Sequence, residues 1–285
     1  MTNRQGVSRG VQRAGGALVL CLVLAGLPGC SFVKMAVARV QPRDRFVPTD
    51  INADVRYAEG SRAVAERVAR ALDGSRKIVE KTHGQAFLDM PPVYVCHTDC
   101  IDTFVPGGKD VTAAHFGNAV FMNDERMRER EKDYNASVEN FLTHELAHVL
   151  LYQHAGALAY MRVPSWFREG LAVSVSNGAG AEACTAKEAA QHIVAGSAFD
   201  PAEEGSVFRD KTAWAYALKP AVFYREAGLF VDYLRTQNPL AFDIALKQLL
   251  TGKDFQHSFA QAYGQTIASH WPGFVASMEQ LLALH

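Results

Sequence analysis

Two histidines and a glutamate occur at the spacing that a catalytic metal ion requires, in the segment His144-Glu145-Leu146-Ala147-His148. Residues four apart on an α-helix are separated by about 40° of rotation and about 6 Å of rise, so His144 and His148 project from one face. Two imidazoles on one face can hold one zinc ion, and an open coordination position would carry a water molecule. Glu145 lies beside them, close enough to act as a base towards that water without being a ligand. The segment therefore predicts a zinc hydrolase.

The motif has only three fixed positions, so its surroundings decide how much it means. The chain contains 10 histidines, and a helix that carries two histidines for packing alone is the competing interpretation. The motif lies in an apolar stretch, residues 141–151, where unpaired imidazoles and an unpaired carboxylate would be costly to bury. A bound metal would remove that cost. We expect this helix to be capped by Asn135 or Ser137 and to end near Gly156.

Two residues compete for the place of the third metal ligand. His154 follows His148 by six residues, but an unbroken helix would turn its side chain about 120° away from that of His148. Glu169 stands near the start of a second predicted helix, which a Pro-Ser pair introduces. A carboxylate from an antiparallel helix can complete a ligand set of two histidines and one glutamate. We therefore expect His144, His148 and Glu169 to bind the metal. A carboxylate that merely stabilises a helix N-terminus is the alternative for Glu169.

The two segments together resemble a known enzyme family. HELAH followed by WFREGLA is similar to the zinc-binding segments of the gluzincin metallopeptidases, the broad group that contains thermolysin and aminopeptidase N. The resemblance implies one Zn²⁺ as cofactor, with His144, His148 and Glu169 as ligands. It also implies that Glu145 is the general base of a peptidase.

A tyrosine farther along the chain extends the resemblance. Residues 223–234, FYREAGLFVDYL, are similar to the helix of aminopeptidase-N-like enzymes whose leading tyrosine donates a hydrogen bond to the oxyanion. The resemblance gives that catalytic role to Tyr224, and a phenol that is not ionised at neutral pH suits it. Packing of Tyr224 in the core is the alternative, with Tyr216 and Tyr233 as possible substitutes.

The chain departs from the family pattern in two places. No GxMEN sequence precedes the zinc motif, and because that element reads the free amino terminus in aminopeptidase N, exopeptidase action is not implied. Val173 stands where thermolysin-like enzymes carry an aspartate that orients a zinc histidine. The sequence therefore does not identify the outer partners of the two histidines.

Residues 1–30 have the features of a secretion signal. Three arginines precede an apolar segment, residues 17–27, which is too short to span a bilayer. The residues before Cys30 resemble the signal of bacterial lipoproteins, which implies cleavage and lipidation of Cys30. The protein would then be lipid-anchored in a bacterial cell envelope, on the periplasmic face of the outer membrane, with residues 31–55 as a tether. An uncleaved anchor over residues 17–40 is the alternative.

Composition and hydrophobic patterning indicate a globular body. Hydrophobic residues make up 48% of the chain and charged residues 21%, and the formal net charge is -1, so nothing suggests nucleic acid as a partner. Helices are expected at residues 61–82, 240–250, 254–263 and 267–284, and strands at residues 93–96 and 119–122. We predict one α+β domain over residues 56–285. A small mixed β-sheet lobe would precede the metal-binding helix, and a mainly helical lobe would follow it, as in zincins.

Two cysteines lie close together after the first predicted strand. In an envelope compartment Cys96 and Cys100 are expected to form a local disulfide. A redox or second metal site built from Cys96, His97 and Cys100 is the less favoured alternative. Cys184 is either a buried thiol or the partner of one of the other two.

Together these features predict a membrane-anchored, zinc-dependent peptidase. The expected partner is a peptide or protein substrate in an extended conformation, which would pair with an exposed strand edge between Val111 and Met122. One other function is a catalytically inactive zinc-fold lipoprotein that serves as a binding or assembly module. Another is a zinc hydrolase that acts on a non-peptide bond.

Overall fold

The computed structural model describes residues 37–38, 40–105, 107–202 and 210–284. Contacts between residues group the chain into two units, with the boundary after Gln41. The second unit, Pro42–His285, is called the folded unit below. The predicted signal segment and its Cys30 lie outside the described residues. Among the residues that are described, no helix combines the length and the apolar character needed to cross a bilayer.

The folded unit begins before residue 56, so the predicted tether over residues 31–55 is wrong in its second half. Phe46 is only 4% exposed and packs its ring against Tyr94 and Phe104. Strand β1 (Val47–Pro48) then pairs antiparallel with β2 (Val55–Tyr57). Proline is tolerated in β1 because that strand is at the edge of the sheet. The buried ring of Phe46 and the pairing of β1 with β2 together attach this proline-flanked segment to the core.

A five-stranded mixed sheet has the order β1-β2-β3-β5-β4. Strands β3 (Val93–Cys96) and β5 (Ala119–Asn123) are parallel neighbours, and β4 (Ala113–Phe116) pairs antiparallel with β5. Both β3 and β5 are buried throughout, because their alternate side chains enter two separate cores. The strand predicted at residues 119–122 is confirmed as β5. It lies inside the sheet, so the exposed edge expected before the metal-binding helix is β4.

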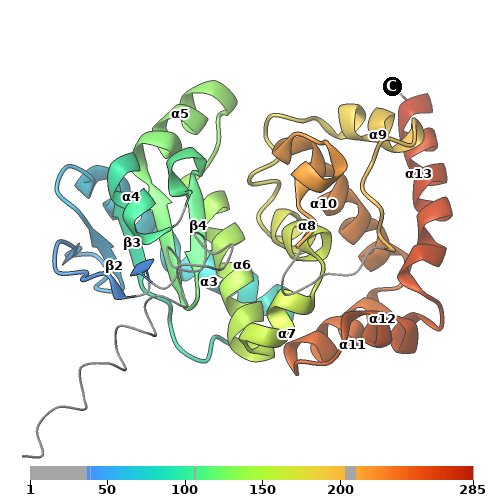
Figure 1. The fold of residues 1–285 in the computed structure, drawn as a ribbon, viewed down its shortest axis with the longest axis horizontal. Coiled ribbons are helices and arrows are strands. Elements are labelled where there is room, and N and C mark those ends of the chain that lie inside the picture. Colours follow the sequence, from blue (N-terminus) through green and yellow to red (C-terminus); the bar gives the residue numbers. More distant parts are fainter. Residues whose placement is uncertain (1–36, 39, 106, 203–209, 285) are drawn as a thin grey trace, which may run out of the picture. The chain divides into compact units, whose positions relative to one another are not determined.

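Helices cover both faces of the sheet. α3 (Arg62–His83) and α6 (Val138–Ala155) lie side by side on one face, as Figure 1 shows. α4 (Thr98–Phe104) packs on the other face, and α5 (Asp124–Tyr134) continues directly from β5. The two cores of the sheet are thereby closed, and α6 is held against β4 and β5.

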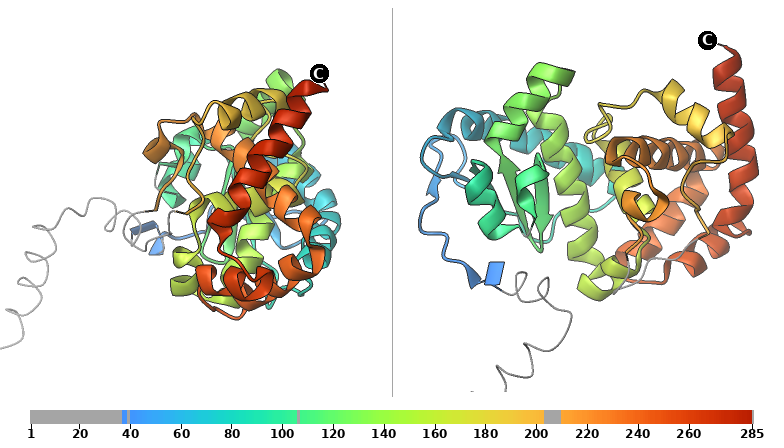
Figure 2. Two further views of the ribbon diagram at one scale, coloured as in Figure 1. Left: turned by 90° about the vertical axis from the view of Figure 1, so that its right-hand side faces the viewer. Right: turned by 45° about the horizontal axis from the view of Figure 1, so that its top comes forward.

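The chain after α6 is mainly helical. Its helices are α7 (Ala157–Arg162), α8 (Ser165–Val175), α9 (Ala186–Val194), α10 (Pro220–Gln237), α11 (Pro239–Leu250), α12 (Phe255–Tyr263) and α13 (Trp271–Ala283), with 3-10 turns at η2 (Ala213–Tyr216) and η3 (Ile267–His270). Figure 1 and Figure 2 show α6 between the sheet and these helices, and it contacts both. The α+β class is confirmed, and so are the helices predicted at residues 61–82, 240–250 and 254–263. The one predicted at residues 267–284 is divided into the 3-10 turn η3 and helix α13.

Candidate metal centre

Helix α6 runs through the centre of the folded unit. Ser137 caps its start by accepting hydrogen bonds from the backbone N–H groups of Glu139 and Asn140. The helix ends before Gly156, as the sequence predicted. Every residue from Phe141 to Leu151 is buried, so packing surrounds this part of the helix on all sides. Polar groups placed here are shielded from bulk water and must find partners within the protein.

Three potential ligand atoms converge on one side of α6. The Nε2 atoms of His144 and His148 are 3.2 Å apart. Glu169 Oε2, from α8, is 3.3 Å from the first and 3.4 Å from the second. Hydrogen bonds can satisfy at most two of these three contacts, because each imidazole nitrogen has at most one proton to donate there. One metal ion would satisfy all three atoms at once, and the group is close enough to hold one.

The separations fit a zinc ion. Bonds of about 2.0–2.1 Å in tetrahedral geometry place neighbouring ligand atoms about 3.3–3.4 Å apart. The three measured separations, 3.2, 3.3 and 3.4 Å, are close to that value. Two imidazole nitrogens and a carboxylate oxygen also match the donor atoms that zinc takes in catalytic sites.

Close packing of two helices positions Glu169. A β-carbon at Gly170 would lie 2.5 Å from the carbonyl oxygen of Ala227 in α10, and one at Gly228 would lie 2.6 Å from Val173 Cγ1. Both positions therefore require glycine, and the contact holds the α8 backbone next to Glu169 in place. Val173 fills the space against Gly228 with a methyl group.

Both carboxylates of the site are ionised at neutral pH. Burial raises the pKa of Glu169, but the charge of His148 and the hydrogen bond from His144 outweigh it and hold the pKa well below its usual range. Burial likewise raises the pKa of Glu145, while the contact with His115 and the charge of His144 lower it further than burial raises it. Glu169 is thus in the state that a ligand needs, and Glu145 is in the state that a base needs.

Tyr224 lies beside the convergent atoms on the α10 side. Its ring stacks near that of His144, with the centroids 6.0 Å apart. Gly180 lies against the Tyr224 ring, where a β-carbon would be 2.7 Å from Cδ2, and its φ of +84° also favours glycine. The negative charge of Glu169, followed by burial, raises the pKa of Tyr224. The phenol therefore keeps its proton and can donate a hydrogen bond.

The residues weighed as alternatives lie in other surroundings. His154 donates a hydrogen bond from Nε2 to the backbone carbonyl of Ala86, on a different side of α6 from His144. Tyr216 and Tyr233 stack on phenylalanine rings of the helical core. Tyr224 is the tyrosine of these three that lines the cavity beside the metal group.

Cys96, Cys100 and Cys184 do not belong to the group of candidate metal ligands. Cys96 and Cys100 form a disulfide between the end of β3 and α4, with their Cα atoms 5.9 Å apart. Cys184 is a buried free thiol. Because the disulfide leaves neither cysteine as a thiolate, it does not support a metal site with His97.

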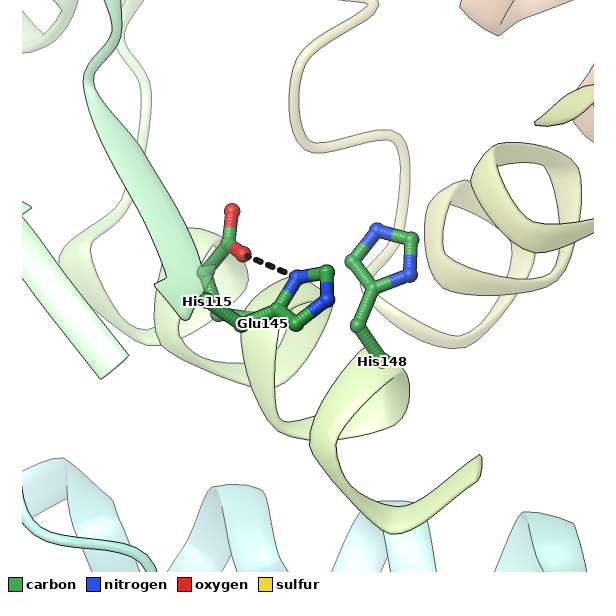
Figure 3. Close-up of side chains that lie close together, drawn as sticks. All are labelled: His115, Glu145 and His148. Carbon is green, nitrogen blue, oxygen red and sulfur yellow. Dashed lines mark ion pairs between the residues drawn. The ribbon is translucent and has the colours of Figure 1, made fainter. Parts of the chain in front are cut away.

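Two further residues reach the site that the sequence did not identify, His115 of β4 and Tyr160 of α7. His115 Nδ1 lies 3.7 Å from Glu145 Oε2. Figure 3 draws this contact as a dashed line. The Tyr160 hydroxyl is 3.0 Å from His115 Nε2 and 3.3 Å from His148 Nδ1. Neither residue belongs to a motif, and α7 is too short for a periodic signal. Only a prediction of β4 itself could have drawn attention to His115.

His115, Glu145 and His148 are also close enough together to be considered as a metal site. However, the two imidazole rings are stacked, with centroids 4.8 Å apart and an interplanar angle of 26°. Ring nitrogens bind metals in the plane of the ring, so nearly parallel rings do not aim at one ion between them. Tyr160 in addition joins their facing nitrogens. We therefore assign the metal to the group that contains Glu169.

A cavity of about 560 Å³ opens onto both groups of side chains. One wall includes residues of β4 and the loop before it, and the opposite wall includes Gly180, Trp214 and Tyr224. β4 ends the strand order of the sheet, so its outer edge has no strand partner within the described residues. An edge of this kind can pair with an extended chain.

No protein-family model and no curated protein sequence matches this chain. The resemblance to gluzincins therefore depends on the sequence motifs alone, and the function must be argued from the geometry of the site.

Proposed function

We propose that the chain is a zinc-dependent peptidase of the gluzincin type, with a zincin-like fold. The observation that carries the proposal is the triangle formed by His144 Nε2, His148 Nε2 and Glu169 Oε2, with sides of 3.2 to 3.4 Å. This spacing suits three ligands of one tetrahedral zinc ion. Glu145 and Tyr224 lie around the triangle, where the chemistry of peptide hydrolysis needs a base and a hydrogen-bond donor.

Each residue has a defined task in the proposed reaction. A zinc ion bound at the triangle would polarise the scissile carbonyl and make water more acidic. Glu145 would take a proton from the attacking water and later pass it to the leaving amine. Tyr224 would donate a hydrogen bond to the carbonyl oxygen as that oxygen gains negative charge. The low exposure of His144, Glu145 and His148 strengthens both interactions, because few water molecules screen them.

The proposed substrate is a peptide or protein segment in an extended conformation. The free edge of β4 supports this proposal, because its backbone can form main-chain hydrogen bonds with an added strand. Trp214, on the opposite wall, is 81% exposed and can contact substrate side chains. No partner role for nucleic acid is proposed.

Location in the cell is proposed from the N-terminal sequence. Cys30 would carry a lipid after signal cleavage, and residues 31–41 would link it to the folded unit, which begins at Pro42. The enzyme would then face the periplasm from the outer membrane of a bacterial cell envelope.

The substitution Glu145→Gln tests the proposal, because it removes the base while leaving all three metal ligands in place. We expect about one zinc per chain to be retained and the cleavage rate of a peptide library to fall roughly 10²- to 10⁴-fold. Glu139→Gln, at an exposed position on the first turn of the same helix, is the matched control. Full activity of Glu145→Gln would refute the mechanism. Zinc binding without cleavage of any peptide by the unmodified chain would favour the binding-module function.

A further inference from the structure

We propose that Tyr160 and His115 are positioning residues that join the metal ligand His148 to the base Glu145 through one directed chain of polar contacts. The inference rests on the metal site of the proposed function and names the outer residues that hold that site in shape. Because these residues come from β4 and α7, two elements that contact α6 would then help to set the orientation of one ligand and one base.

Metal binding fixes the direction of the first two contacts. His148 faces the other ligand atoms through Nε2, so this nitrogen must present its lone pair to the metal and the ring proton lies on Nδ1. The Nδ1–H group then donates to the Tyr160 oxygen, 3.3 Å away. Tyr160 donates its own hydroxyl proton to Nε2 of His115, at 3.0 Å.

The direction continues through the His115 ring. With Nε2 accepting, the ring proton of His115 lies on Nδ1, the nitrogen that faces Glu145 Oε2 across 3.7 Å (Figure 3). This separation is longer than a normal hydrogen bond, but it places a positively polarised N–H group opposite the carboxylate. The orientation of the base is thus connected to that of His148 through fixed protons.

Tyr160 is suited to this role by its surroundings. It is only 4% exposed, so its hydroxyl must find its hydrogen-bond partners inside the protein. The guanidinium of Arg168 lies 4.8 Å from its ring centroid, and the rings of Tyr152 and His115 pack edge-on against it. By contrast, His144 Nδ1 has no hydrogen-bond partner within the described part of the chain. The hydrogen bond from His148 to Tyr160 is therefore the outer contact that fixes a histidine ligand.

Zinc affinity of Tyr160→Phe tests the proposal. Loss of an outer hydrogen bond to a metal-binding histidine typically lowers affinity about 10- to 100-fold, and we expect a loss of this size in competition with a chelator on the full chain. Tyr152→Phe is the matched control, because Tyr152 packs against Tyr160 and its hydroxyl forms no hydrogen bond with another described residue. The affinity of this control should equal that of the unmodified protein.

A second measurement determines which atoms donate in this series of polar contacts, without any substitution at Tyr160. Nitrogen NMR of the zinc-loaded protein, labelled with ¹⁵N at histidine, should show His115 and His148 both protonated at Nδ1. His115→Asn identifies its signal. Protonation of His115 at Nε2, or a Tyr160→Phe variant that binds zinc as tightly as the unmodified chain, would overturn the inference alone. An unmodified chain that binds no zinc would instead refute the proposed function, and the inference with it.

Discussion

The two walls of the cavity hold their functional groups by different physical means. On the helical wall, Glu169 and Tyr224 belong to α8 and α10, which approach each other so closely that the contact requires glycine. On the sheet wall, His115 of β4 is held by polar contacts with Tyr160 of α7 and with Glu145 of α6. Added volume should therefore destabilise the helical wall, whereas the loss of a polar atom should weaken zinc binding on the sheet wall.

Helix α10, which carries Tyr224, also contains an unfavourable buried group, Glu226. Its side chain is 0% exposed, and neither oxygen forms a hydrogen bond of normal geometry with another described residue. Burial raises its pKa from 4.5 to about 8. Between these values the unfolded chain releases the proton while the folded chain retains it. Stability therefore falls as the pH rises, by about 1.4 kcal/mol per pH unit.

The substitution Glu226→Gln should remove this loss. We expect the free energy of unfolding to increase by about 3–5 kcal/mol at pH 8 and to change little at pH 4.5, measured by urea unfolding of the metal-free protein. Glu279→Gln, at an exposed position on α13, is the control. An equal gain at both pH values would show that the effect comes from packing and not from the charge.

A tyrosine substitution on the helical wall tests whether the two walls differ in this way. Tyr224→Phe keeps the ring that packs against Gly180 and removes only the hydroxyl. Since that hydroxyl is proposed to stabilise charge on the substrate, kcat should fall about 100- to 1000-fold while KM stays unchanged. A loss of zinc affinity as large as that expected for Tyr160→Phe would mean that the two walls do not differ in this way.

The smallest predicted effect concerns volume. Gly170→Ala adds one methyl group at the contact between α8 and α10, where a β-carbon would meet the backbone of Ala227 at 2.5 Å. We expect the free energy of unfolding to fall by about 1–3 kcal/mol. Gly74→Ala in α3 is the matched control, because the nearest atom is a glutamate side-chain oxygen at 3.5 Å. That variant should gain about 0.5–1 kcal/mol. Equal stability of the two variants would refute the volume argument.

The residues of the helical wall could be predicted from sequence because the candidate site residues occur within segments whose hydrophobic pattern already indicates a helix. The motif on α6 fixes two ligand atoms by helix geometry alone, and the capping residue Ser137 marks the start of the helix. Glu169 could be placed at the metal by assuming one tertiary contact, between α6 and the helix that carries Glu169. The apolar residues that follow Glu169 indicate that this helix is buried. Tyr224 could be identified as a site residue only from the resemblance of its helix to a known enzyme family.

The sheet wall could not be predicted in the same way. His115 and Tyr160 reach α6 only after β4 and α7 have packed against it, and neither element is long enough to give a periodic signal. The start of the folded unit was missed for a related reason. The burial of Phe46 and the pairing of β1 with β2 attach a segment whose prolines suggest a tether.

X-ray absorption at the zinc edge of the zinc-loaded chain tests the central claim most directly, because it reports the atoms around the ion. The account predicts about one zinc per chain, with two imidazole nitrogens at about 2.0–2.1 Å and a carboxylate oxygen at about 2.0–2.2 Å. His144→Ala should lose one imidazole from this shell, or the ion altogether. Sulfur at about 2.3 Å, a shell without two imidazoles, or a chain that takes up no zinc would contradict the assignment of His144, His148 and Glu169 as ligands.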